Sequence, residues 1–111
     1  MRASRIDKKT GKPHISEKVF TAQVITMARA FGWMAAHFRP ALTQRGRWIT
    51  AMAGDIGYPD ITMARNKRVI FAELKTEIGN LTFGQSAWQS ALPNFYVWRP
   101  SDIEEIERIL R

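Results

Sequence analysis

Two apolar runs that flank a polar pair of residues constrain the fold of this chain most strongly. Residues 61–65 and 68–75 are rich in apolar and β-branched side chains, and Asn66-Lys67 lies between them. This pattern is typical of a β-hairpin with a tight turn. In a hairpin that is symmetric about the turn, Arg65 faces Arg68, Met63 faces Ile70, Ile61 faces Ala72, and Asp60 faces Glu73.

The last of these pairs places two carboxylates opposite each other. Residues directly opposite on neighbouring strands are about 4.5–5.5 Å apart, and like charges at that separation repel. A divalent cation would remove the repulsion, because Mg²⁺ and Mn²⁺ prefer carboxylate oxygens. Side chains alternate along a strand, so Lys75 should lie on the same face as Glu73, while Leu74 points into the core.

The charge of the chain predicts a polyanionic partner. Seventeen Lys and Arg residues oppose ten Asp and Glu residues, which gives a formal net charge of +7 over 111 residues. A small domain this basic is typical of nucleic-acid binding, although a charge that only aids solubility is the alternative. The positive residues gather in two segments, and we expect DNA contacts from Arg2, Arg5, Lys8, Lys9, Lys12, Arg39, Arg45 and Arg47.

Composition also excludes several classes of protein. The chain has no Cys, so disulfides and thiolate metal sites are excluded, and an intracellular, cytoplasmic location is expected. Its apolar runs are too short for a membrane span, and residues 1–9 lack the apolar segment of a signal peptide. A length of 111 residues suits one folded domain.

The remaining patterns predict an α/β domain. We expect a flexible basic arm over residues 1–15 and a single domain over 16–111. Within the domain, residues 39–58 are expected to be irregular. Helices are predicted near 16–31, 82–92 and 100–110, and strands near 33–38, 60–65, 68–75 and 95–98. The order of elements is α-β-β-β-α-β-α, which predicts a mixed β-sheet flanked by helices.

One set of positions matches a known pattern: Gly57-Tyr58-Pro59-Asp60, Glu73-Leu74-Lys75, Gln85, Glu17 and the run from Tyr96 to Asp102. Together they resemble the VRR-NUC domain of the PD-(D/E)xK nuclease superfamily. The resemblance covers about residues 16–110 and implies a restriction-endonuclease-like core. Short members of this family are similar to phage-encoded Holliday-junction resolvases, so the resemblance is also to phage proteins that act in a bacterial host.

The resemblance implies a role for each matching residue. Asp60, Glu73 and the Leu74 carbonyl would hold Mg²⁺ or Mn²⁺, with Glu17 as a further metal-site acid. The cation would polarise a phosphoryl oxygen and lower the pKa of a bound water. Lys75 would orient the attacking water and stabilise charge on the phosphate, or would only neutralise the two acids.

The resemblance also places Gln85 beside the scissile phosphate. Local sequence offers other roles for two of the proposed site residues. Gln85 lies three residues after Thr82, the spacing of a capping box, and Glu17 is favoured at a helix N-terminus by the helix dipole.

The expected function is therefore metal-dependent hydrolysis of phosphodiester bonds in branched DNA, with Holliday junctions as the first candidate. A junction is two-fold symmetric and requires two cuts, so a homodimer is expected. Two alternatives stay open. One is a non-catalytic DNA-binding module on a nuclease fold, and the other is a flap, nick or restriction-like endonuclease.

Overall fold

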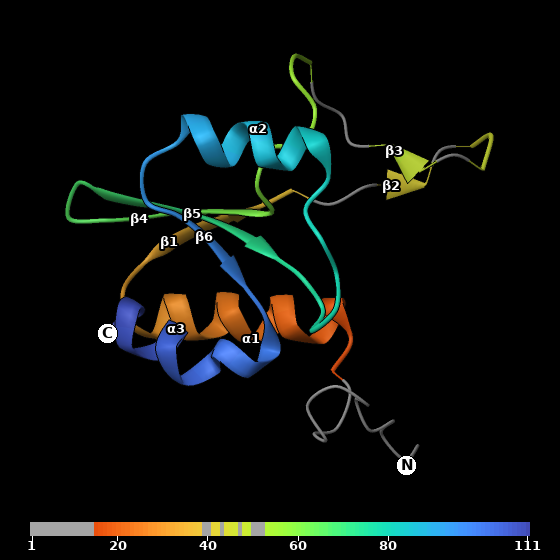
Figure 1. Cartoon of the computed structure of the whole chain (residues 1–111). Helices are drawn as coiled ribbons and strands as arrows, with labels where there is room; N and C mark the ends of the chain where they lie inside the picture. The colour runs from red at the N-terminus through yellow and green to blue at the C-terminus, as the bar shows by residue number, and fades with distance from the viewer. Residues whose placement is uncertain (1–14, 39–40, 43, 47, 50–52) are drawn as a thin grey trace, which may run out of the picture.

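The computed structural model describes residues 15–38, 41–42, 44–46, 48–49 and 53–111. Over these residues the protein is an α/β domain built around a four-stranded mixed sheet. Helix α2 (Phe83–Ala91) covers one face of the sheet, and helices α1 (Glu17–Ala30) and α3 (Ile103–Leu110) cover the other (Figure 1). The predicted α/β class and the flanking helices are confirmed. No helix in the described part of the chain is long and apolar enough to cross a membrane.

Helix α1 begins and ends where the sequence predicts. The Ser16 side chain accepts a hydrogen bond from the Val19 N–H, which caps the first turn. Phe20, Val24 and Ala28 recur every fourth residue and are fully buried against the sheet.

The main sheet has the strand order β1-β4-β5-β6. Strands β1 (Met34–His37), β4 (Ile61–Arg65) and β5 (Arg68–Leu74) are antiparallel, and β6 (Phe95–Trp98) is parallel to β5. The hairpin between β4 and β5 pairs Arg65 with Arg68 and Ile61 with Ala72, so the predicted register is confirmed. Its turn residues Asn66 and Lys67 have positive φ angles of 51° and 65°. A two-residue turn with this conformation matches the right-handed twist of the two strands that it joins.

One prediction about the chain between β1 and β4 is wrong. The sequence predicts an irregular segment over residues 39–58, but Ala41–Leu42 (β2) and Trp48–Ile49 (β3) form a small antiparallel ribbon outside the main sheet (Figure 1). The order α-β-β-β-α-β-α describes the main sheet and its helices and omits this ribbon. A two-residue strand carries too few side chains for its alternation to be recognised in a sequence.

The connection from β5 to β6 contains α2. Parallel neighbouring strands need a crossover connection of this kind, which is usually a helix. Strand β6 then leads through a 3₁₀ turn, η1 (Pro100–Asp102), into α3. The predicted third helix therefore begins with a 3₁₀ turn, and its end at Leu110 is confirmed.

The C-terminal end of α3 is held by Arg65, at the end of the inner strand β4. The Arg65 guanidinium donates to the carbonyls of Phe31 (2.8 Å) and Leu110 (2.9 Å), and it lies 4.5 Å from the centre of the Trp33 ring. The Trp33 indole N–H also donates to the Leu110 carbonyl, at 2.8 Å. These contacts join both helices to the end of the hairpin that is remote from Asp60.

Candidate functional site

The two carboxylates lie where β4 begins and β5 ends. Since Ile61 faces Ala72, the next facing positions on the two chains belong to Asp60 and Glu73. The Leu74 N–H donates to Asp60 Oδ2 at 2.9 Å, and the Phe38 N–H donates to the Asp60 carbonyl at 3.1 Å. Asp60 is therefore fixed from both neighbouring strands, next to Glu73.

The Glu73 carboxylate is almost completely removed from solvent. The residue is 1% exposed, and its Oε2 accepts a hydrogen bond of 3.0 Å from Gln85 Nε2. The same oxygen lies 3.6 Å from Lys75 Nζ. Its other oxygen, Oε1, is buried and has no hydrogen-bond partner among the described residues. A buried carboxylate oxygen without a donor is unfavourable, so a proton or a cation is needed there.

This environment raises the pKa of Glu73 from 4.5 to about 8. Burial is the largest cause, followed by the negative charge of the neighbouring Asp60. Lys75 lowers the pKa, and the charge of Glu17 raises it slightly further. Without a cation, the pair therefore holds a proton at neutral pH.

The predicted alternation along β5 is confirmed. Leu74 is fully buried in the core beneath α1, whereas Lys75 lies on the opposite face with Glu73. The Lys75 side chain is only 15% exposed, so its ammonium group is held close to the carboxylates. One ammonium group thus accompanies two acids, and an excess negative charge stays on the site when both acids are ionised.

Gln85 completes the capping box that its spacing from Thr82 predicts, and it also contacts the carboxylate site. Its position beside a scissile phosphate stays a prediction. Its Oε1 accepts from the Thr82 N–H at 2.9 Å while its own N–H donates to Thr82 Oγ1, which completes a capping box. Its Nε2 simultaneously donates to Glu73 Oε2. The capping box fixes which end of the amide is the donor, so Gln85 always presents an N–H to the carboxylate.

A close backbone contact holds α2 against the segment before Asp60. Gly57 has φ of +93°, and a Cβ atom there would lie 2.4 Å from the Gly84 carbonyl carbon. Tyr58, the next residue, packs edge-on against Phe38, Phe71 and Trp88. The Gly57–Gly84 contact thus sets the distance between the chain that carries Asp60 and the helix that carries Gln85.

Replacing Gly57 with Ala should lower the free energy of unfolding by about 3 kcal/mol or more, because it adds a steric clash to a strained φ. Gly54→Ala is a matched control, since Gly54 has φ of +105° and open space around its Cα. That control should lose only about 1 kcal/mol. Urea unfolding of both variants checks this, and equal losses would show that the close contact with Gly84 is unimportant.

The other predicted site residues have different outcomes. Glu17 is exposed in the first turn of α1, and its charge contributes to the raised pKa of Glu73, so its role as a metal ligand stays a prediction. Arg45 is described and exposed. The remaining predicted DNA contacts lie outside the described residues: Arg2, Arg5, Lys8, Lys9, Lys12, Arg39 and Arg47.

The residues around Glu73 fit a divalent cation. Two adjacent carboxylates supply the oxygens that Mg²⁺ prefers, and the buried Oε1 has a lone pair without a donor. In the described part of the chain, no group of three or more His, Cys, Asp or Glu side chains forms a metal site. Further ligands would therefore be the predicted Leu74 carbonyl, water or phosphate, which suits Mg²⁺ because it retains several waters.

The raised pKa of Glu73 predicts how metal-free stability depends on pH. The folded state binds this proton up to about pH 8, whereas the unfolded state releases it near 4.5. The stability that this proton contributes is therefore fully present below about pH 4.5, and it is lost as the pH rises through about 8. The free energy of unfolding should fall with a slope of at most about 1.4 kcal/mol per pH unit.

Urea unfolding of the metal-free protein across this pH range would reveal the slope. Glu73→Gln should flatten it and should be more stable than the wild type at pH 9, because the amide carries no charge to bury. Glu104→Gln, on the exposed surface of α3, should keep the wild-type slope. An identical slope in the Glu73 variant would show that another group causes the pH dependence.

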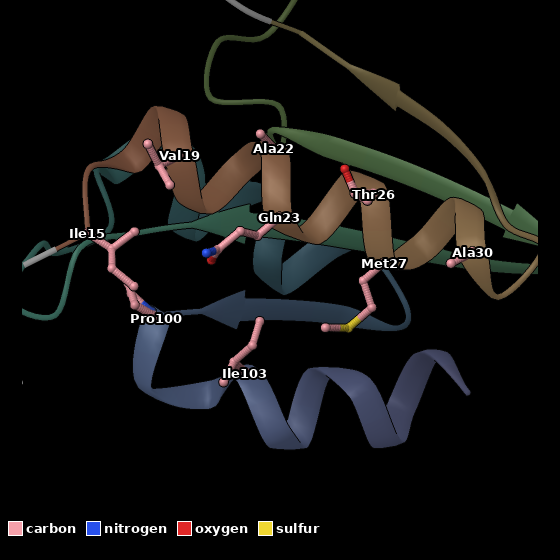
Figure 2. Close-up of a pocket in the computed structure, with 9 residues that line it drawn as sticks. All are labelled: Ile15, Val19, Ala22, Gln23, Thr26, Met27, Ala30, Pro100 and Ile103. Carbon is pink, nitrogen blue, oxygen red and sulfur yellow. The ribbon is translucent and has the colours of Figure 1, made fainter. Parts of the chain in front are cut away.

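A hollow lies on the side of the sheet that α1 and α3 cover, opposite the carboxylate site. It has a volume of about 720 Å³ and lies between the side of α1 and the start of the η1–α3 segment (Figure 2). Ile15, Met27, Pro100 and Ile103 border it, and none of its lining residues is ionisable. It therefore offers no general acid or base, and the carboxylate pair is the better candidate for chemistry.

Comparisons with known proteins give no relative for this chain. No family model matches it, and no curated protein or solved structure matches it either. Inferences about function therefore depend on the residues and geometry of the site.

Proposed function

We propose that this protein is a Mg²⁺- or Mn²⁺-dependent DNA endonuclease with a PD-(D/E)xK core of the VRR-NUC type. The observation that carries the proposal is the buried Glu73 carboxylate, opposite Asp60 and with one oxygen lacking a partner among the described residues. A fold gains nothing from two facing acids unless a cation or proton joins them. The formal net charge of +7 favours a polyanionic substrate.

Each residue of the site has a role in this proposal. Asp60 and Glu73 hold the cation, which when bound polarises a phosphoryl oxygen and lowers the pKa of water. Lys75 orients the attacking water and stabilises the negative charge that develops on the phosphate. Gln85 keeps the Glu73 carboxylate oriented through its hydrogen bond of 3.0 Å. The two strands and α2 hold these groups in place before substrate binds.

The proposed substrate is branched DNA, with Holliday junctions first. This choice rests on the resemblance of Gly57-Tyr58-Pro59-Asp60 and Glu73-Leu74-Lys75 to the VRR-NUC domain. Resolution of a junction requires two symmetric cuts, so a homodimer is part of the proposal.

Cleavage of a set of labelled DNAs tests the proposal. The purified protein is incubated in Mg²⁺ or Mn²⁺ with a four-way junction, a flap, a nicked duplex and an intact linear duplex. We expect cuts near the branch of the junction, no cuts in EDTA, and none in linear duplex. Fixed cuts in linear duplex would indicate a restriction-like enzyme. Tight junction binding without cutting in either metal would contradict nuclease activity and favour a non-catalytic DNA-binding module.

A further inference from the structure

Two large apolar side chains are exposed beside the carboxylate site. Phe83, the first residue of α2, is 94% exposed, and Ile56 is 83% exposed. Both border a hollow of about 400 Å³ that Asp55, Ala87 and Trp88 also line. We call Ile56, Phe83 and this hollow the apolar platform. Exposed apolar residues that cluster in this way mark interaction surfaces, whereas scattered single ones do not.

The apolar platform is built from the same two segments as the carboxylate site. Ile56 precedes Gly57, whose backbone packs against Gly84, and the Trp88 indole N–H donates to the Ile56 carbonyl at 3.1 Å. Phe83 lies two residues before Gln85, and Ile56 lies four residues before Asp60. The contacts that align Asp60 with Gln85 therefore also hold the apolar platform at a fixed position relative to them.

The chemistry of the apolar platform favours a nucleobase over a phosphate. Among the described residues, Asp55 is the one charged residue that lines the hollow, and its negative charge disfavours a phosphate there. A carboxylate can accept hydrogen bonds from the amino group of a base. The exposed ring of Phe83 offers a flat face for stacking, which every base can use. A base in a duplex is already stacked and paired, so only an unpaired base is free to bind there. The formal net charge of +7 over the chain favours association with DNA as a whole.

We propose that the apolar platform stacks one unpaired nucleobase of a DNA strand whose backbone runs to the carboxylate site. This inference rests on the proposed function, and it names a feature of branched DNA that the protein would recognise: a base that is unpaired, in a flap or where the branch point of a junction opens. Phe83 supplies the stacking face, Ile56 covers the edge of the base, and Asp55 accepts from its amino group.

Binding measurements with Phe83 variants test this inference. Fluorescence anisotropy is measured with labelled single-stranded DNA and with a duplex of the same sequence, in Ca²⁺ so that no cleavage occurs. Phe83→Ala should weaken binding of the single strand by about 5- to 150-fold and leave duplex binding unchanged. Phe83→Trp should retain affinity, and Phe83→Leu should lose it, because leucine keeps the apolar bulk without the ring.

Met34→Ala is the matched control. Met34 is also exposed, at 79%, but it pairs with Ala64 at the end of the sheet remote from Asp60. Its replacement should leave both affinities unchanged.

Three outcomes would count against these proposals. If Phe83→Ala binds single-stranded DNA as tightly as the wild type, or loses affinity equally for single strand and duplex, the stacking role is overturned even if the wild type cuts DNA. If Phe83→Ala loses self-association in sedimentation but keeps its affinity for DNA, the stacking role is overturned as well. The apolar platform would then bind a second copy of the chain. A wild type that binds none of the DNAs would contradict the proposed function itself.

Discussion

Replacing Asp60 with Asn is expected to lower the rate of DNA cleavage by roughly 10³-fold or more, because the metal loses an anionic ligand. The fold should be retained. The amide oxygen of the new side chain can still accept from the Leu74 N–H, as Asp60 Oδ2 does at 2.9 Å. The NH₂ group of that amide can donate to Glu73, whose Oε1 has no hydrogen-bond partner among the described residues.

The same variant should therefore be at least as stable as the metal-free wild type, while Mg²⁺ should stabilise the wild type more than the variant. Thermal unfolding with and without Mg²⁺, beside single-turnover cleavage, separates these effects. Glu104→Gln removes one negative charge from an exposed position and should change neither quantity. Cleavage by Asp60→Asn at the wild-type rate would contradict the proposed metal site.

The hairpin could be predicted from the sequence because its determinants are local. The turn at Asn66-Lys67 fixes the register, and alternation then assigns each side chain to a face. The opposition of Asp60 and Glu73 and the placement of Lys75 beside Glu73 follow from these two facts. The caps at Ser16 and Thr82 are local signals of the same kind, and both are confirmed.

Contacts between distant segments could not be predicted in this way. Gly84 in the first turn of a helix lowers helix propensity, and such a glycine is a signal that a neighbouring backbone lies close. Its partner, Gly57, lies 27 residues earlier in the chain, and only the folded sheet and α2 bring the two together. The buried Oε1 of Glu73 and the exposure of Phe83 likewise depend on how α2 sits on the sheet.

Replacing Lys75 with Met is expected to lower the cleavage rate by about 10²- to 10³-fold, the usual effect of removing a group that stabilises transition-state charge. Methionine keeps most of the side-chain length, so packing at this 15%-exposed position should survive. Lys75 also lowers the pKa of Glu73. In the variant that pKa should rise further, and Mg²⁺ binding at pH 7 should weaken because the metal competes with the proton.

These two consequences separate a chemical role of Lys75 from mere neutralisation of the acids. At pH 9 with saturating Mg²⁺, the bound metal displaces the proton from Glu73 in both proteins. If Lys75 acts on water and phosphate, Lys75→Met stays slow under these conditions although calorimetry shows wild-type metal binding. Recovery of the wild-type rate would mean that Lys75 only adjusts Glu73. Lys67→Met, at the hairpin turn remote from Asp60, should match the wild type throughout, since Lys67 shares the charge but not the site.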